Sequence, residues 1–166
     1  MMRVGHGFDA HRLIEGRRLV LGGITVPHDR GALGHSDADV LAHALSDALL
    51  GAAAMGDLGG HFPDSDPQWK DADSIVLLEA CAARVREAGY RIVNLDATIV
   101  VEHPKLAPYI GAMREHLATR LELPLECVSV KAKTSEGMGF TGDGTGIAAF
   151  AIASILRGDH SDRTSQ

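Results

Sequence analysis

The segment from Gly5 to His11, which reads GHGFDAH, restricts the possible folds of this chain more than any other stretch. Side chains alternate between the two faces of a strand, so in an extended strand Asp9 and His11 point the same way and can bind one ion. Gly5 and Gly7 leave that face bare, which suits the close approach of a backbone or a ligand. The segment therefore predicts a strand, over residues 3–9, that carries metal ligands.

A second polar cluster follows at residues 35–39, and His43 lies just after it. We expect His43 on a helix from Ser36 to about Ala54, because Ser36 and Asp39 have the spacing of a capping box. Asp39 and Asp47 each lie one turn from His43, so either carboxylate is a candidate to orient its ring. A lone helical histidine is more often structural, but the Asp-x-His pair favours a ligand.

Three ligands from aspartate and histidine, without a thiolate, are typical of a zinc site that keeps its fourth position for a substrate. The pattern predicts chemistry at this site, since structural zinc sites are usually closed by four protein ligands.

Composition and charge narrow the class of protein. A chain of 166 residues fits one domain, which we expect over 1–157 with a polar tail at 158–166. A net charge of −6 argues against a nucleic-acid partner. Cys81 and Cys127 are too few for a disulfide framework and indicate free thiols in a reducing cytoplasm. No signal peptide or apolar span is visible, so we expect a cytoplasmic protein without a membrane partner.

Strands and helices alternate along the chain. We expect further strands at 18–21 and 24–26, joined by Gly22-Gly23, and at 94–101 and 128–133, with helices from Asp73 or Ser74 to Gly89 and over 106–121. Residues 147–156 fit either type, and 57–67 reads as a loop. The pattern indicates an α+β fold, in which helices pack on one face of a mixed sheet and the other face is buried in a closed ring of identical subunits.

Four segments together carry a family resemblance: GHGFDAHRL at 5–13, HSDADVLAHALSDALLGAAAMGDLG at 35–59, FPDSDP at 62–67 and KTSEGMGFTGDG at 133–144. They resemble the 2-C-methyl-D-erythritol 2,4-cyclodiphosphate synthases of the non-mevalonate isoprenoid pathway, and the resemblance runs from Val4 to about Leu156. It implies a metal-dependent lyase that converts 4-CDP-2-C-methyl-D-erythritol 2-phosphate into the cyclic diphosphate and CMP. It also implies a homotrimer with active sites between subunits.

The resemblance assigns roles to individual residues. It implies that zinc is bound by Asp9, His11 and His43, that Glu136 binds Mg²⁺ or Mn²⁺, and that His35 and Thr134 support the transition state. The implied substrate contacts also include Ala10, Ser36 and Phe140. The implied methylerythritol pocket consists of Asp57, Leu58, Gly59, Phe62, Pro63, Asp64, Ser65 and Asp66. The implied cytidine pocket consists of Val101, Glu102, His103, Pro104, Lys105, Leu106, Ala107, Lys133, Thr134, Ser135 and Glu136. The alternative interpretation is that His35 only neighbours a helix cap and Thr134 only ends a strand, without a part in the chemistry.

Two positions depart from the pattern of some family members. Asp143 and Phe150 stand where those members have an arginine and a glutamate beside an isoprenoid-diphosphate cavity on the trimer axis. An acidic Asp143 cannot pair with a diphosphate without a cation, so the departure argues against that ligand here.

Two other hypotheses stay open at this point. One is a phosphohydrolase that uses a metal-bound water. The other is a trimeric binding module in which the metal is structural.

Overall fold

The computed structural model describes residues 1–63, 65–69 and 72–158. Within these residues, five strands form one sheet in the order β4-β1-β7-β5-β6. They are β1 (Met2–Glu15), β4 (Arg30–Ala32), β5 (Tyr90–Val100), β6 (Val128–Lys133) and β7 (Gly146–Arg157). β5 and β6 run parallel and the other neighbouring strands antiparallel, so the sheet is mixed. The expected α+β class is confirmed.

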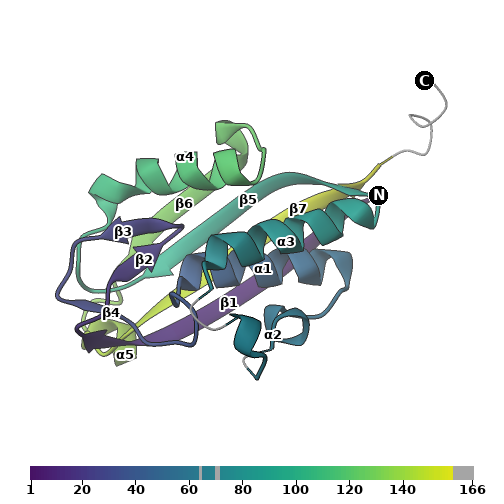
Figure 1. The fold of residues 1–166 in the computed structure, drawn as a ribbon. Helices are drawn as coiled ribbons and strands as arrows, with labels where there is room; N and C mark the ends of the chain where they lie inside the picture. Colours follow the sequence, from purple (N-terminus) through teal and green to yellow (C-terminus); the bar gives the residue numbers. More distant parts are fainter. Residues whose placement is uncertain (64, 70–71, 159–166) are drawn as a thin grey trace.

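Three long helices cover one face of this sheet (Figure 1). They are α1 (Val40–Ala53), α3 (Ser74–Glu87) and α4 (Ile110–Arg120). Shorter helical segments are α2 (Leu58–His61), α5 (Gly139–Gly142), η1 (Pro67–Trp69), η2 (Ala107–Tyr109) and η3 (Leu125–Cys127). The predicted hairpin of β2 (Leu19–Leu21) and β3 (Ile24–Val26) forms a separate small sheet, with positive φ at both turn glycines.

The packing of α1 on β1 explains the bare glycine face of β1. A Cβ atom built on Gly7 would lie 1.8 Å from the Ala44 carbonyl oxygen, and one on Gly5 would lie 2.0 Å from that of Ala48. The helix backbone therefore rests directly on the strand, which neither position would allow with a larger residue. This contact holds α1 against the strand that carries Asp9 and His11.

Several element boundaries differ from those expected. α1 begins at Val40 and not at Ser36, because the Asp39 side chain accepts from the backbone N–H groups of Leu41 and Ala42 and is the true N-cap. The preceding Ala38 has a φ of 56°, which ends any helical continuation toward Ser36.

The other differences are smaller. β1 extends to Glu15, β5 already begins at Tyr90, and the expected helix at 106–121 divides into η2 and α4. The expected loop at 57–67 contains α2 and the start of η1. Residues 147–156, which fitted either type, belong to strand β7. The division into a domain of 1–157 and a tail stays a prediction, and residues 159–166 of that tail lie outside the described residues.

The sheet face opposite the helices has two halves of different character. Val4, Phe8, Phe150 and Ile152 of β1 and β7 are exposed there, and the Phe8 and Phe150 ring centroids lie 5.0 Å apart. The half formed by β5 and β6 is polar and carries an ion pair between Asp96 and Lys131. Among the described residues, no helix combines the length and apolar character needed to cross a membrane.

Candidate functional site

Asp9, His11 and His43 converge on one point between β1 and α1, as predicted. Asp9 Oδ2 lies 2.8 Å from His43 Nδ1 and 3.0 Å from His11 Nε2, and the two ring nitrogens are 3.4 Å apart. The ligands of a tetrahedral zinc ion with bonds of about 2.0–2.1 Å lie about 3.3–3.4 Å from one another. The three groups therefore fit a divalent metal ion after shifts of a few tenths of an ångström.

The charges at this centre are coupled. Burial raises the pKa of the Asp9 carboxyl, but its hydrogen bonds to His11 and His43 outweigh this and hold that pKa below its usual range. Burial lowers the pKa of His43, yet the hydrogen bond that its ring donates to Asp9 and the charges of Asp9, Asp39 and Asp37 raise that pKa overall. The site therefore keeps a carboxylate ionised and attracts positive charge, as a cation site must.

The residues that orient His43 are not those expected. The second ring nitrogen of His43, Nε2, lies 2.8 Å from Ser74 Oγ on α3. The Asp39 carboxylate is instead committed to the α1 cap and to the Gly23 amide, and Asp47 accepts from the Leu58 amide at 2.7 Å. The prediction that Asp39 or Asp47 accepts the His43 proton is wrong, because both carboxylates already hold backbone N–H groups.

A cavity of about 270 Å³ opens beside the three ligands. It is lined by Asp9, His11, Gly34, His35, Ser36, His43, Leu58, Gly59, Phe62, Trp69 and Leu77. Gly34, Trp69 and Leu77 were not foreseen. The sequence offers a weak signal for Trp69 alone, because it is the only tryptophan of the chain.

His35 is exposed at this cavity and five residues before α1. The expected helix start at Ser36 would have placed His35 directly before the first turn, but α1 begins later and Asp39 occupies the amides of Leu41 and Ala42. Its role in supporting the transition state remains a prediction, and this role would require a hydrogen bond from the His35 imidazole itself.

Aromatic and basic side chains hold the Phe62 wall of the cavity. The Phe62 and Trp69 rings meet edge to face at 4.9 Å, and the Arg84 guanidinium lies 4.9 Å from the Phe62 centroid. Arg84 also donates to His61 Nδ1, while His61 Nε2 donates to the Met55 carbonyl at 2.8 Å. This wall is therefore tied to α3, which also supplies Ser74.

Other expected contacts of this pocket have local roles. Asp57 caps α2 through the Gly60 amide at 2.8 Å, and Asp66 accepts from the Gln68 amide at 3.1 Å. Pro63, Ser65 and Asp66 are not among the residues that line the cavity in the described structure, and Asp64 lies outside the described residues. Their contact with substrate stays a prediction.

A second cavity, of about 140 Å³, brings together the two segments expected around cytidine. It is lined by Val101, Pro104, Lys105, Leu106, Ala107, Ala132, Lys133 and Thr134. The segments meet because β5 and β6 are parallel neighbours, and the Val101 amide donates to the Lys133 carbonyl at 3.0 Å. Ala132 was not foreseen. Glu102, His103 and Ser135 lie in the same turns without lining the cavity in the described structure.

Glu136 lies apart from the other proposed metal ligands. It follows β6, its φ is 52°, and its carboxylate accepts from Thr134 Oγ1 at 2.7 Å. β6 is three strands from β1 in the sheet, a separation of roughly 14 Å at the usual strand spacing. Among the described residues, the ligand atoms that lie within 4.8 Å of one another belong to Asp9, His11 and His43, and Glu136 is not one of this group.

A third cavity, of about 250 Å³, lies on the other side of His11. Its lining contains Ala10 and Phe140, both expected substrate contacts, together with His11, Arg12, Thr145 and Gly146. His11 therefore borders two cavities.

Comparisons with known proteins identify the family of the chain. The YgbB family matches residues 2–156. The 2-C-methyl-D-erythritol 2,4-cyclodiphosphate synthases of Moorella thermoacetica and Salinibacter ruber are both 59% identical to the chain. Each match covers 93% of this chain, with 95% of the Moorella protein and 98% of the Salinibacter protein.

Solved structures are similar over nearly the whole chain. A CDP-bound form of 2C-methyl-D-erythritol-2,4-cyclodiphosphate synthase has a TM-score of 0.86 at 38% identity and covers 93% of this chain and 100% of its own. The bifunctional IspDF of Campylobacter jejuni has a TM-score of 0.92 at 39% identity and covers 96% of this chain, which spans only 43% of that longer protein. The chain therefore belongs to the YgbB family.

Proposed function

We propose that this chain converts 4-CDP-2-C-methyl-D-erythritol 2-phosphate into 2-C-methyl-D-erythritol 2,4-cyclodiphosphate and CMP. The observation that carries the proposal is the convergence of Asp9, His11 and His43 at the edge of a cavity that also contains His35, Ser36 and Phe62. The names of its close relatives, which match over 93% of the chain, support the same reaction. It is a step of isoprenoid biosynthesis.

The reaction needs no nucleophile from the protein. An oxygen of the substrate's own 2-phosphate forms a bond to the β-phosphorus, the bond from that phosphorus to the CMP oxygen breaks, and CMP leaves with the electron pair. Both reacting groups are on one molecule, and good alignment of such groups supplies roughly 7–11 kcal/mol of barrier reduction. The task of the chain is therefore to hold the substrate bent and to neutralise its phosphates.

The residues divide this task. Asp9, His11 and His43 would hold zinc, and Glu136 would offer the oxygen ligand that Mg²⁺ or Mn²⁺ prefers. When bound, the two cations supply Lewis acidity and neutralise the phosphate charge. His35 donates a hydrogen bond to the phosphoryl group that is transferred, and Thr134 does so once its hydroxyl hydrogen turns from the Glu136 carboxylate to the phosphate. Phe62 with its neighbours encloses the methylerythritol carbons, and the cavity between β5 and β6 takes the cytidine.

A homotrimer completes the site. Within one chain Glu136 does not belong to the group of Asp9, His11 and His43, and in the proposed trimer a neighbouring subunit supplies it to their site. The exposed apolar side chains Val4, Phe8, Phe150 and Ile152 on the face opposite the helices give a closed ring of subunits a surface to bury. Both cysteines are free thiols, which suits the proposed cytoplasmic location.

Oxygen labelling tests the reaction. Purified protein is incubated with substrate and Mg²⁺ in water enriched in oxygen-18, and the products are identified by phosphorus NMR and mass spectrometry. We expect CMP and a cyclic diphosphate, both without label. A linear product that carries solvent oxygen would contradict the proposed cyclisation and show that the protein is a hydrolase.

A further inference from the structure

Two polar side chains that do not line the cavity, those of Ser74 and Asp37, follow one another from the His43 ring. His43 Nε2 is 2.8 Å from Ser74 Oγ, and Ser74 Oγ in turn donates to Asp37 Oδ1. From this geometry we infer that Ser74 and Asp37 are positioning residues for the metal ligand His43. The inference rests on the proposed metal site and adds to it the groups that set the proton and the angle of the ring.

The order of donors and acceptors fixes the tautomer of His43. The Asp37 carboxylate can only accept, so the single hydroxyl proton of Ser74 points to Asp37. The lone pairs of Ser74 Oγ are then left to accept, and His43 Nε2 must carry the hydrogen. When a metal ion is bound, Nδ1 therefore presents its lone pair to the ion, in place of the hydrogen that it shares with Asp9 in the metal-free site.

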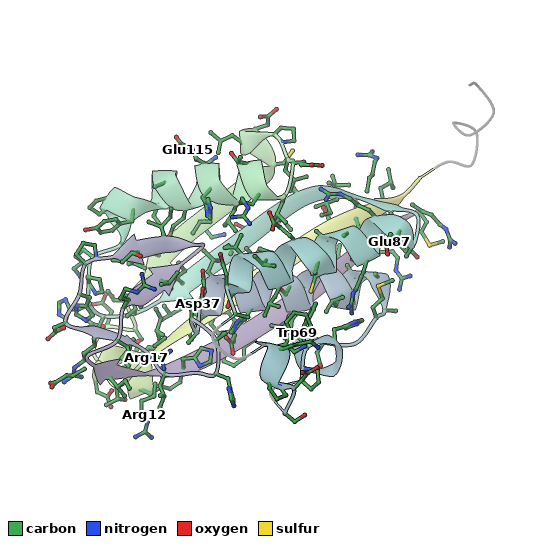
Figure 2. All side chains as sticks on the ribbon, viewed as in Figure 1. Arg12, Arg17, Asp37, Trp69, Glu87 and Glu115 are labelled. Atoms are coloured by element: carbon green, nitrogen blue, oxygen red, sulfur yellow. The ribbon has the colours of Figure 1, made fainter. Side chains whose placement is uncertain are left out.

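The supporting groups are themselves held in place. Ser74 is fully buried as the first residue of α3, and its backbone amide donates to Asp37 Oδ2 at 3.3 Å. Asp37 Oδ1 also accepts from the Asp39 amide at 3.3 Å. Figure 2 shows Asp37 where the first turns of α1 and α3 meet. Ser74 and Asp37 therefore connect the starts of the two helices next to His43, and this connection fixes the position of the Ser74 hydroxyl that contacts the ring.

Ser36 is the other hydroxyl near this ring, but it is the weaker candidate. Its Oγ lies 3.3 Å from His43 Nε2, which is longer than the 2.8 Å contact of Ser74, and it already accepts from the Ala38 amide at 3.1 Å. Ser74 has the shorter contact and the carboxylate behind it.

Zinc affinity measures the positioning role directly, by competition with a chromophoric chelator on the full-length protein. Loss of such a supporting partner typically weakens metal binding by about 10–100-fold, which is the loss we expect for Ser74→Ala. Asp37→Asn keeps the shape of the acceptor but removes its charge, so we expect a smaller loss in the same direction. Ser46→Ala is the matched control: Ser46 is also fully buried, and it donates to the Ala42 carbonyl on α1.

A second readout follows the ring itself. In the zinc-loaded wild-type protein, NMR should show His43 protonated at Nε2, with slow exchange of that hydrogen with solvent. Ser74→Ala should speed this exchange and Ser46→Ala should leave it unchanged. If Ser74→Ala does not fold, as judged by circular dichroism, Asp37→Asn decides the question.

The possible results separate this inference from the proposed function. In the first case, His43→Ala loses zinc but Ser74→Ala and Asp37→Asn bind it as tightly as the wild type. This result would overturn the positioning role alone. Zinc binding that persists in His43→Ala would overturn the proposed metal site as well. Weaker binding in Ser74→Ala with normal binding in Ser46→Ala supports the inference.

Discussion

Replacement of Gly7 by alanine should damage both the fold and the metal site. The added Cβ would lie 1.8 Å from the Ala44 carbonyl oxygen and 2.7 Å from the Ala48 amide nitrogen, whereas ordinary contacts begin at 3.4 Å. Both partners are backbone atoms of α1, so neither can rotate away. The helix must move out by about 1.6 Å, the difference between 3.4 and 1.8 Å, unless the strand gives way.

This shift has a cost in stability and a cost in binding. Overpacking a core typically costs about 1–3 kcal/mol, and a clash between two backbones falls at the upper end or beyond. The metal ligands are also affected, because His43 is on α1 while Asp9 and His11 are on β1. Functional groups tolerate displacements of about 0.5 Å, so zinc affinity should fall together with stability.

Urea unfolding in the presence of a chelator gives the stability, and zinc competition gives the affinity. Gly51→Ala is the control: its Cβ meets only the His6 carbonyl oxygen at 3.8 Å, and as a helical substitution it should stabilise by about 0.5–1 kcal/mol. The reasoning is refuted if Gly7→Ala unfolds at the same urea concentration as the wild type and binds zinc equally well.

Three further predictions concern other groups. Burial raises the pKa of Asp39 from 3.8 to about 6, so the ionised carboxylate costs stability above pH 6. The free energy of unfolding relative to Asp39→Asn should therefore rise by about 2 kcal/mol as the pH falls from 7 to 4, and a difference in urea titrations that does not change with pH would contradict this. Glu136→Gln should leave zinc content unchanged and raise the Mg²⁺ concentration needed for half-maximal activity, so an unaltered Mg²⁺ dependence would count against its role. Arg84→Met removes the cation above Phe62, a contact worth about 0.5–2 kcal/mol, and should raise KM more than it lowers kcat. Equal KM values for both proteins would limit Arg84 to a structural role.

The metal ligands could be predicted because two local periodicities define them. Asp9 and His11 share a strand face whatever the strand pairs with, and a histidine on a neighbouring helix could complete the set. Ser74 could not be predicted in the same way, because it meets His43 only through the packing of α3 beside α1, 31 residues later in the chain.

The misplaced start of α1 has a different physical cause. Ser36 and Asp39 both fit the sequence of a helix cap, and local spacing does not choose between them. The choice is made by the fold, where Asp39 is fully buried and also holds the Gly23 amide of the β2–β3 hairpin at 2.8 Å. That long-range contact also removes Asp39 as a partner for His43.

The ambiguity of residues 147–156 was of the same kind. Their small apolar side chains show no clear period, because β7 lies at the centre of the sheet between β1 and β5. Its residues from Gly146 to Ala149 are buried regardless of the face on which they lie. Only the antiparallel pairing on both sides identifies this segment as a strand.

Diffraction at the zinc absorption edge tests the central claim most directly, on crystals of the protein grown with zinc and CDP. We predict one anomalous peak per chain, at about 2.0–2.2 Å from an Asp9 oxygen, His11 Nε2 and His43 Nδ1, with a fourth ligand that does not come from the protein. A peak that lies elsewhere, or a fourth ligand supplied by a side chain, would contradict the account.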